Sequence, residues 1–282
     1  MNILVTGADG QLGRTFRKMT DGLDWNIMYT DISELDITDA DAVMDVVCAG
    51  NIGLILNFAA YTDVAKAEKD EETARRVNAQ APANLARAAK AADAFLVHIS
   101  SDYVFDGKCS VPYGEDAEAC PLNVYGRTKL EGDEAVEKSG CRYIIIRTSW
   151  LYSEFGHNFV KTIYEKTASN PVINVVSDQT GSPTYAGDLV GFILNVIESD
   201  MLGYTGLYNF SNEGVCSWYD LALEVCDISG HLCEVRPCST DDYPSGVLRP
   251  SYSVLDKNRV RRTFGISIPH WKDSLRFCMR QF

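Results

Sequence analysis

The chain has 282 residues, of which 46% are hydrophobic, so it can bury a large core without support from disulfides or metals. Its 26 basic and 39 acidic side chains give a net charge of −13, which argues against sequence-independent binding to nucleic acid or to an anionic membrane surface. No charged leader precedes the first strand pattern and no apolar run is long enough for a membrane span, so we expect a cytoplasmic protein.

Short apolar runs alternate with helical patterns through the first half of the chain. The expected strands cover residues 3–5, 26–30, 54–58, 95–99 and 143–146. Helical patterns separate them, as at residues 14–19 and 73–92. Strands that are covered by helices on both faces form parallel sheets. The pattern therefore predicts an α/β fold with a Rossmann-type, doubly wound parallel sheet.

The regular alternation loosens after about residue 150. Helical patterns at residues 188–198 and 218–226 flank a strand-like run at 207–210, which suggests that the chain returns to the sheet. We predict a dinucleotide-binding domain at residues 1–150 with return segments near 186–212. The remainder of 151–282 is expected to form mainly a smaller, discontinuous α/β substrate lobe.

A glycine-rich loop follows the first expected strand. Gly7, Gly10 and Gly13 stand three residues apart, and Gln11 and Leu12 lie between the last two. Glycines permit the tight turn and let a pyrophosphate approach the amide groups at a helix N-terminus. A glycine loop alone could be an ordinary turn, but strand, glycines and helix occur here in the order that a dinucleotide site requires.

Acidic residues follow the second expected strand. Asp31 stands where a carboxylate binds the adenosine ribose hydroxyls and repels a 2′-phosphate, which favours NAD. Arg14 is close enough in sequence to offer a phosphate contact, so both NADH and NADPH stay open as cofactors. Asp36 could reach the adenine and Ile37 could flank it, although Asp36 is also typical of a helix start.

Small residues and hydroxyl groups end the third and fourth expected strands. The segment 57–62 contains two alanines, as expected where the backbone passes the nicotinamide half of a dinucleotide, although packing alone explains such residues too. Ser100 and Ser101 end the fourth strand, at the sheet edge where ligands gather. Because neighbours in a strand point opposite ways, we expect only one of them to face the ligand. We favour Ser101, a choice that rests more on the family resemblance described below than on alternation. His98 is expected to be a core histidine.

Tyr125 and Lys129 stand four residues apart in a helical pattern, which places both on one face. An ammonium group beside a phenol favours the phenolate, which a tyrosine needs if it is to exchange a proton near neutral pH. The spacing alone also fits a surface ridge. Its position after the glycine loop and the serine-ended strand favours catalysis.

Nine cysteines are scattered along the chain with no Cys-x-x-Cys pair, so their spacing predicts neither a zinc site nor a redox motif. We expect reduced thiols, mostly packed as small apolar residues. Only Cys216, Cys226, Cys233 and Cys238 are close enough in sequence to leave a disulfide open.

Several blocks in order resemble one known family. They comprise the glycine loop and residues 35–38, 57–68, 100–105, 121–129, 147–152 and 178–184. The whole chain resembles the extended short-chain dehydrogenase/reductases, and within them the dTDP-4-dehydrorhamnose reductases. The resemblance implies NADH- or NADPH-dependent reduction of the 4-keto group of dTDP-4-dehydro-L-rhamnose to give dTDP-L-rhamnose.

The resemblance also implies roles for individual residues. Tyr125 would protonate the carbonyl oxygen, Lys129 would tune Tyr125 and hold the nicotinamide ribose, and Ser101 would bond the same oxygen. Relatives often have threonine at the position of Ser101. The cofactor would be lined by Gly7, Gly10, Gln11, Leu12, Gly13, Asp31, Asp36, Ile37, Ala60, Tyr61, Thr62, Ile99, Tyr125 and Lys129, and the substrate by Ser101, Asp102, Tyr103, Trp150 and Arg249.

Arg249 is the candidate diphosphate contact in the second lobe, and an ordinary surface arginine is the alternative. Some members of the family dimerise around a magnesium ion held by carboxylates. No cluster of carboxylates in the sequence indicates such a site, so we expect no metal. A homodimer is predicted from the resemblance alone.

Two other functions compete with reduction. A nucleotide-sugar epimerase would share the fold, the cofactor and the Tyr-Lys pair, and a non-catalytic regulatory subunit would share the fold and dinucleotide binding. Ser101, Tyr125 and Lys129 together argue against the second. Dehydratases place an Asp-Glu pair after the active-site hydroxyl, whereas Asp102 is followed here by Tyr103.

Overall fold

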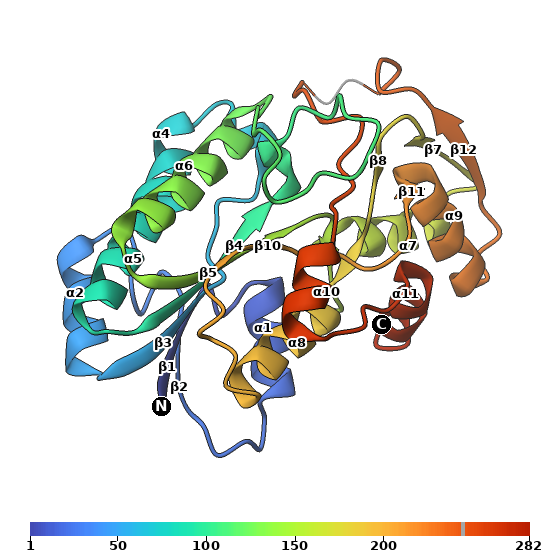
Figure 1. Cartoon of the computed structure of the whole chain (residues 1–282). Coiled ribbons are helices and arrows are strands. Elements are labelled where there is room, and N and C mark those ends of the chain that lie inside the picture. Colours follow the sequence, from blue (N-terminus) through green and yellow to red (C-terminus); the bar gives the residue numbers. More distant parts are fainter. Residues whose placement is uncertain (244–245) are drawn as a thin grey trace.

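A six-stranded parallel sheet organises the computed structural model, which describes residues 1–243 and 246–282 (Figure 1). Its strand order is β10-β5-β4-β3-β1-β2, and the bounds are β1 (Asn2–Thr6), β2 (Asn26–Thr30), β3 (Ile52–Asn57), β4 (Phe95–Ser101), β5 (Arg142–Thr148) and β10 (Gly206–Asn209). The predicted Rossmann-type fold is confirmed. The chain order reverses between β1 and β3, and ligands in such sheets bind at the carboxyl ends beside this reversal.

Helices cover both faces of the sheet (Figure 1). Ile3 and Val5 of β1 enter the core shared with α1 (Gln11–Met19), α8 (Ala186–Glu198) and α10 (Asn258–Phe264). Leu4 enters the opposite core, shared with α2 (Ala40–Ala49), α5 (Ala81–Ala91) and α6 (Val124–Ser139). Because side chains alternate across a strand, strands buried on both faces read as uninterrupted apolar runs.

The helical pattern predicted at residues 73–92 is broken in the structure. Helix α4 (Glu71–Arg75) continues into a π-helical turn, η1 (Arg76–Gln80), before α5 begins. This turn presents Asn78, whose Oδ1 accepts the Tyr61 backbone N–H at 2.8 Å and whose Nδ2 donates to the Tyr61 carbonyl at 3.1 Å. The π turn therefore fixes the loop after β3, which leads into α3 (Val64–Ala67).

The second half of the chain builds a smaller lobe around short strand pairs (Figure 1). Its core gathers residues such as Tyr152, Val235 and Leu275. The pairs are β6 (Leu151–Tyr152) with β9 (Thr184–Tyr185), β7 (Val172–Val176) with β12 (Glu234–Cys238), and β8 (Thr180–Gly181) with β11 (Cys216–Ser217). Three helices pack on them: α7 (Phe159–Ser169), α9 (Trp218–Ser229) and α11 (Trp271–Met279). The domain boundaries given above stay a prediction.

The cysteines differ from the expectation of buried, apolar packing. All nine are free thiols, but only Cys216, Cys226 and Cys278 are buried, whereas Cys48, Cys109 and Cys120 are exposed. The expectation that most are packed in the interior is therefore wrong. A cysteine pattern carries no periodic signal that separates core from surface positions.

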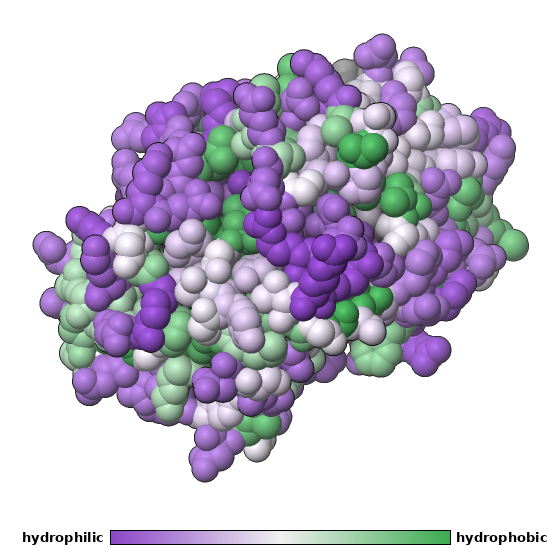
Figure 2. All heavy atoms as spheres, in the orientation of Figure 1, coloured by the Kyte–Doolittle hydropathy of each residue, from purple (hydrophilic) through white to green (hydrophobic). Residues whose placement is uncertain are grey.

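Hydrophilic side chains cover much of the face drawn in Figure 2, with smaller hydrophobic areas between them. A strongly hydrophilic patch covers α10, the helix that carries three arginines. Arg259 pairs there with Asp116, and Arg261 pairs with Glu213 at 2.9 Å, so acids from other elements offset the positive charge. In the described ranges, no helix is both long and apolar enough to cross a membrane.

We predict that Gly13→Ala destabilises the protein by about 1–3 kcal/mol, because a Cβ there would lie 2.4 Å from the Gly7 carbonyl oxygen and 2.5 Å from the Ala8 Cα. Urea unfolding would measure the loss. Gly191→Ala in α8 is the matched control, since nothing lies within 4 Å of its Cβ position and alanine favours a helix by about 1 kcal/mol. Equal stabilities for both variants would contradict the prediction.

Candidate active site

One cavity of about 1020 Å³ opens at the carboxyl ends of the parallel strands. Its wall contains every residue predicted for the cofactor or the substrate except Gly13. Gly13 instead lies behind the loop, where it allows α1 to approach Gly7 and Ala8. The tertiary structure therefore gathers residues from the first strand to Arg249 at one place.

The glycine loop forms a cradle for an anionic group. Gly7 has a φ of +65°, and Gly10 is the N-cap of α1 with no side-chain cap of its own. The first N–H groups of the helix lack partners within it and are available to a ligand. A pyrophosphate fits this arrangement, because the helix dipole and the amide donors both favour negative charge.

Carboxylates flank the end of β2 at the next part of the cavity. Asp31 accepts the backbone N–H groups of Asp9 at 3.0 Å and Ile32 at 2.8 Å, which fixes its carboxylate at the wall. Asp36 accepts the backbone and hydroxyl of Thr38, and these hydrogen bonds lower the pKa of Asp36. Both positions suit the adenosine half of a dinucleotide.

Arg76 lines this region and was not anticipated from the sequence. Its Nη2 donates to the Thr38 hydroxyl at 3.1 Å. Arg14, which we considered as a phosphate contact, lies over the Phe155 ring at 4.6 Å and outside the cavity wall. The π-helical turn η1 brings Arg76 to the site, and no short motif signals that turn.

Helix α6 places Tyr125 and Lys129 one turn apart in the cavity wall. The Asn123 side chain caps the helix by accepting the Gly126 N–H at 2.8 Å. The Tyr125 ring meets the edge of Tyr103, with centroids 5.4 Å apart. Burial raises the pKa of Tyr125 above its ordinary value, and a hydrogen bond with Ser101 opposes that shift, so the phenol holds its proton at neutral pH.

Lys129 is almost completely buried and donates from Nζ to the Ile99 carbonyl at 2.7 Å. Burial lowers the pKa of Lys129 to about 8, while the charge of Asp133 opposes the shift. The ammonium group at the end of β4 therefore has a pKa only slightly above neutral pH. This property suits a residue that must influence proton transfer near neutral pH.

The two serines at the end of β4 point to different partners. Ser100 donates to Asp133 at 2.7 Å. Ser101 donates to Asp102 at 3.1 Å and accepts the Tyr103 N–H at 3.2 Å, which caps the turn η2 (Asp102–Val104). Both serines line the cavity, so the expectation that only one of them faces it is wrong, but Tyr125 hydrogen-bonds with Ser101.

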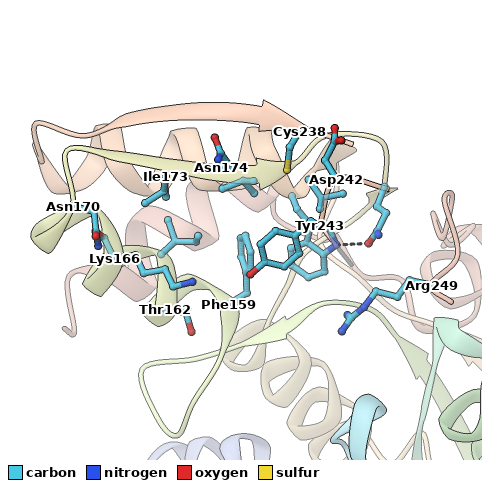
Figure 3. A pocket seen from close by; sticks show the side chains of 15 residues that line it. Phe159, Thr162, Lys166, Asn170, Ile173, Asn174, Cys238, Asp242, Tyr243 and Arg249 are labelled. Atoms are coloured by element: carbon cyan, nitrogen blue, oxygen red, sulfur yellow. Dashed lines mark hydrogen bonds between the residues drawn. The ribbon is translucent and has the colours of Figure 1, made fainter. Parts of the chain in front are cut away.

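A second cavity of about 620 Å³ is drawn in Figure 3, and Trp218 and Arg249 line both this cavity and the first. Figure 3 shows Lys166 and Arg249 toward opposite ends of it, with Tyr243 between them. Trp218 stacks on Trp150 with ring centroids 3.6 Å apart, and Arg249 donates to the Tyr103 hydroxyl at 3.0 Å. The sequence singled out only Arg249 as a site residue among the residues of this cavity, because the others come from α7, β7, α9, β12 and separate loops.

Among residues 1–243 and 246–282, no group of three or more His, Cys, Asp or Glu side chains is placed so that it could hold a metal ion. The acids at the cavity instead bond to backbone and hydroxyl groups.

The sheet, the glycine cradle and the Ser-Tyr-Lys set together define an NAD(P)-dependent oxidoreductase of the extended short-chain dehydrogenase/reductase class. A family model described as the RmlD substrate binding domain matches residues 1–282. The chain belongs to the dTDP-4-dehydrorhamnose reductase family.

Individual relatives match along the whole chain. The dTDP-4-dehydrorhamnose reductase of Aggregatibacter actinomycetemcomitans is 38% identical, with 97% of each chain covered. The crystal structure of a dTDP-4-dehydrorhamnose reductase from Clostridium acetobutylicum is 40% identical, with 99% of each chain covered and a TM-score of 0.95. That of the Bacillus anthracis reductase, in complex with NADP, is 36% identical, with 99% of each chain covered and a TM-score of 0.94.

We predict that the free energy of unfolding of Asp102→Asn, relative to that of wild type, is higher at pH 7.5 than at pH 4. Burial raises the pKa of Asp102 from 3.8 to about 6. The contribution of Asp102 to wild-type stability therefore falls as the pH rises from about 4 to about 6, because the buried side chain must then lose its proton. The shift corresponds to about 2–3 kcal/mol. Urea unfolding of both proteins at each pH measures the difference, and a stability gap that does not change with pH would contradict the prediction.

Proposed function

We propose that this chain reduces the 4-keto group of dTDP-4-dehydro-L-rhamnose to dTDP-L-rhamnose, with NADH or NADPH as the hydride donor. The observation that carries the proposal is the single cavity that joins the glycine cradle to Ser101, Tyr125 and Lys129. The names of the relatives, which match over almost the full chain, support the choice of sugar nucleotide.

The side chains of the chain have distinct parts in this reaction. Bound reduced nicotinamide supplies the hydride to C4. Tyr125 donates its proton to the carbonyl oxygen, and its raised pKa keeps it protonated until the substrate arrives. Ser101 donates a hydrogen bond to the same oxygen, and the Lys129 ammonium stabilises the phenolate that remains.

The nucleotide half of the substrate occupies the second cavity in this proposal. Arg249 lies at its junction with the first cavity, where it can meet the diphosphate. Trp150 lines the sugar side, with one face covered by Trp218. The partner is thus a dTDP-sugar, whereas a homodimer and a cytoplasmic location remain predictions.

We expect the purified protein to oxidise NADPH or NADH stoichiometrically with dTDP-4-dehydro-L-rhamnose, and Tyr125→Phe to lower kcat by at least about 100-fold, as expected for loss of a general acid. Loss of nicotinamide absorbance measures the reaction. Tyr164→Phe, which changes a tyrosine outside both cavities, should retain activity.

The same mixture separates the proposal from its alternatives. Conversion of the sugar without net oxidation of the nicotinamide would identify an epimerase. Cofactor binding without conversion of dTDP-4-dehydro-L-rhamnose would reject the proposed reaction.

We predict that Asp31→Asn raises the ratio of kcat/KM for NADPH to that for NADH by about tenfold or more, because it removes a charge that repels the 2′-phosphate. The amide oxygen can still accept a backbone N–H of the loop. Initial rates with each cofactor measure the ratio. Asp39→Asn, at the N-cap of α2 and away from the cavity wall, is the control, and an unchanged ratio for Asp31→Asn would exclude this role.

A further inference from the structure

A group of buried polar side chains lies behind Lys129, and the proposed chemistry does not use it. Asp133 follows Lys129 by one turn of α6 and is 1% exposed. Its Oδ2 accepts the Ser100 hydroxyl at 2.7 Å and Arg147 Nε at 3.3 Å. Ser100 belongs to β4 and Arg147 to β5, so the carboxylate connects the helix to two strands.

His98 lies near the other oxygen of the same carboxylate but does not hydrogen-bond to it. The Thr6 hydroxyl donates to Asn57 Oδ1 at 2.8 Å, which turns Asn57 Nδ2 toward His98 Nδ1 at 2.9 Å. His98 Nδ1 is then the acceptor, and the ring proton lies on Nε2, 3.7 Å from Asp133 Oδ1. Burial holds the pKa of His98 well below its ordinary value, so the ring stays neutral.

The buried charges do not balance without Asp133. Lys129 and Arg147 are 1% and 5% exposed, and both are cations whose burial is costly unless a carboxylate compensates. Lys129 interacts with Asp133 on α6 and with neutral His98 on β4, and Arg147 on β5 bonds to the same carboxylate. Burial raises the pKa of Asp133, while the charges of Arg147 and Lys129 oppose that shift and favour the carboxylate. Asp133 is therefore the buried carboxylate that both cations share, while the more exposed Glu137 adds a negative charge near Arg147.

We propose that Asp133 is a positioning residue that keeps the Lys129 ammonium charged, and that Ser100 and Arg147 hold the Asp133 carboxylate in place. The proposal rests on the proposed function for its catalytic consequence but not for the charge state itself. Asp133 acts on the substrate only through Lys129, which donates to the Ile99 carbonyl. Removal of the carboxylate should make the ammonium lose its proton at a lower pH, because an opposite charge no longer favours the charged form.

The first test is an NMR titration of Lys129 in protein labelled at the lysine ε-carbon. The Lys129 signal is assigned by its absence in Lys129→Met. We expect Asp133→Asn to move its midpoint at least about one pH unit toward acid. Glu134→Gln, next to Asp133 on α6 but exposed and paired with Lys138 at 2.7 Å, is the matched control and should leave the midpoint unchanged. An unchanged midpoint in folded Asp133→Asn would overturn the proposal.

The second test is the pH dependence of kcat/KM for the sugar nucleotide. In Asp133→Asn, the fall of kcat/KM at alkaline pH should begin at a lower pH, by the same amount as the shift in the Lys129 midpoint. In Asp133→Glu, this alkaline limb should lie closer to its wild-type position. A lower kcat with an unshifted limb would show a merely structural role and overturn the proposal. If wild type converts no sugar, the proposed function fails, whereas the NMR titration still decides the role of Asp133.

Asp133→Asn leaves Arg147 buried without its counter-ion and can fail to fold for that reason. The double variant Asp133→Asn/Arg147→Gln removes the ion pair as a unit and avoids an isolated buried charge. It should retain the thermal unfolding transition and still show the acid shift of Lys129, because the Asp133 charge raises the pKa of Lys129. A wild-type midpoint in the folded double variant would equally overturn the proposal.

Discussion

The burial of the Lys129 ammonium at the end of β4 is the constraint on which the arrangement of the site depends. Taking a charge out of water is costly unless hydrogen bonds and an opposite charge replace the solvent. The Ile99 carbonyl provides the hydrogen bond and Asp133 the charge. Asp133 in turn requires Ser100 and Arg147. These contacts bind α6 to β4 and β5, so the same interactions that make the charge tolerable also place Tyr125 at the cavity.

The boundary between the two lobes brings together groups that the chain order keeps far apart. The glycine cradle and the Tyr-Lys pair belong to the large sheet, whereas Trp218 belongs to α9 of the smaller lobe. Both cavities meet at Trp218 and Arg249. A substrate with a sugar, a diphosphate and a nucleoside can use such a junction because each part meets a different chemistry.

Local sequence rules account well for the sheet and the cofactor side of the site. Uninterrupted apolar runs follow from burial on both faces of a parallel sheet, and they located the first five strands within a few residues. The glycines, Asp31, Ser101 and the Tyr125-Lys129 pair could be found because each stands at a fixed distance from a strand or helix end. The burial of the cysteines could not be predicted in this way. Most of them were expected to be packed in the interior, but Cys48, Cys109 and Cys120 are exposed.

By itself the sequence determined the fold class, the cradle at the end of β1 and the helical face shared by Tyr125 and Lys129, because each depends on periodicity or on spacing within one or two elements. Tertiary structure alone decided that Arg76 enters the cofactor cavity, that Trp218 stacks on Trp150, and that His98 faces Asp133. Those contacts depend on a π turn, on lobe packing and on strand register. Their physical origin is the close packing of separate elements, which leaves no local pattern in the chain.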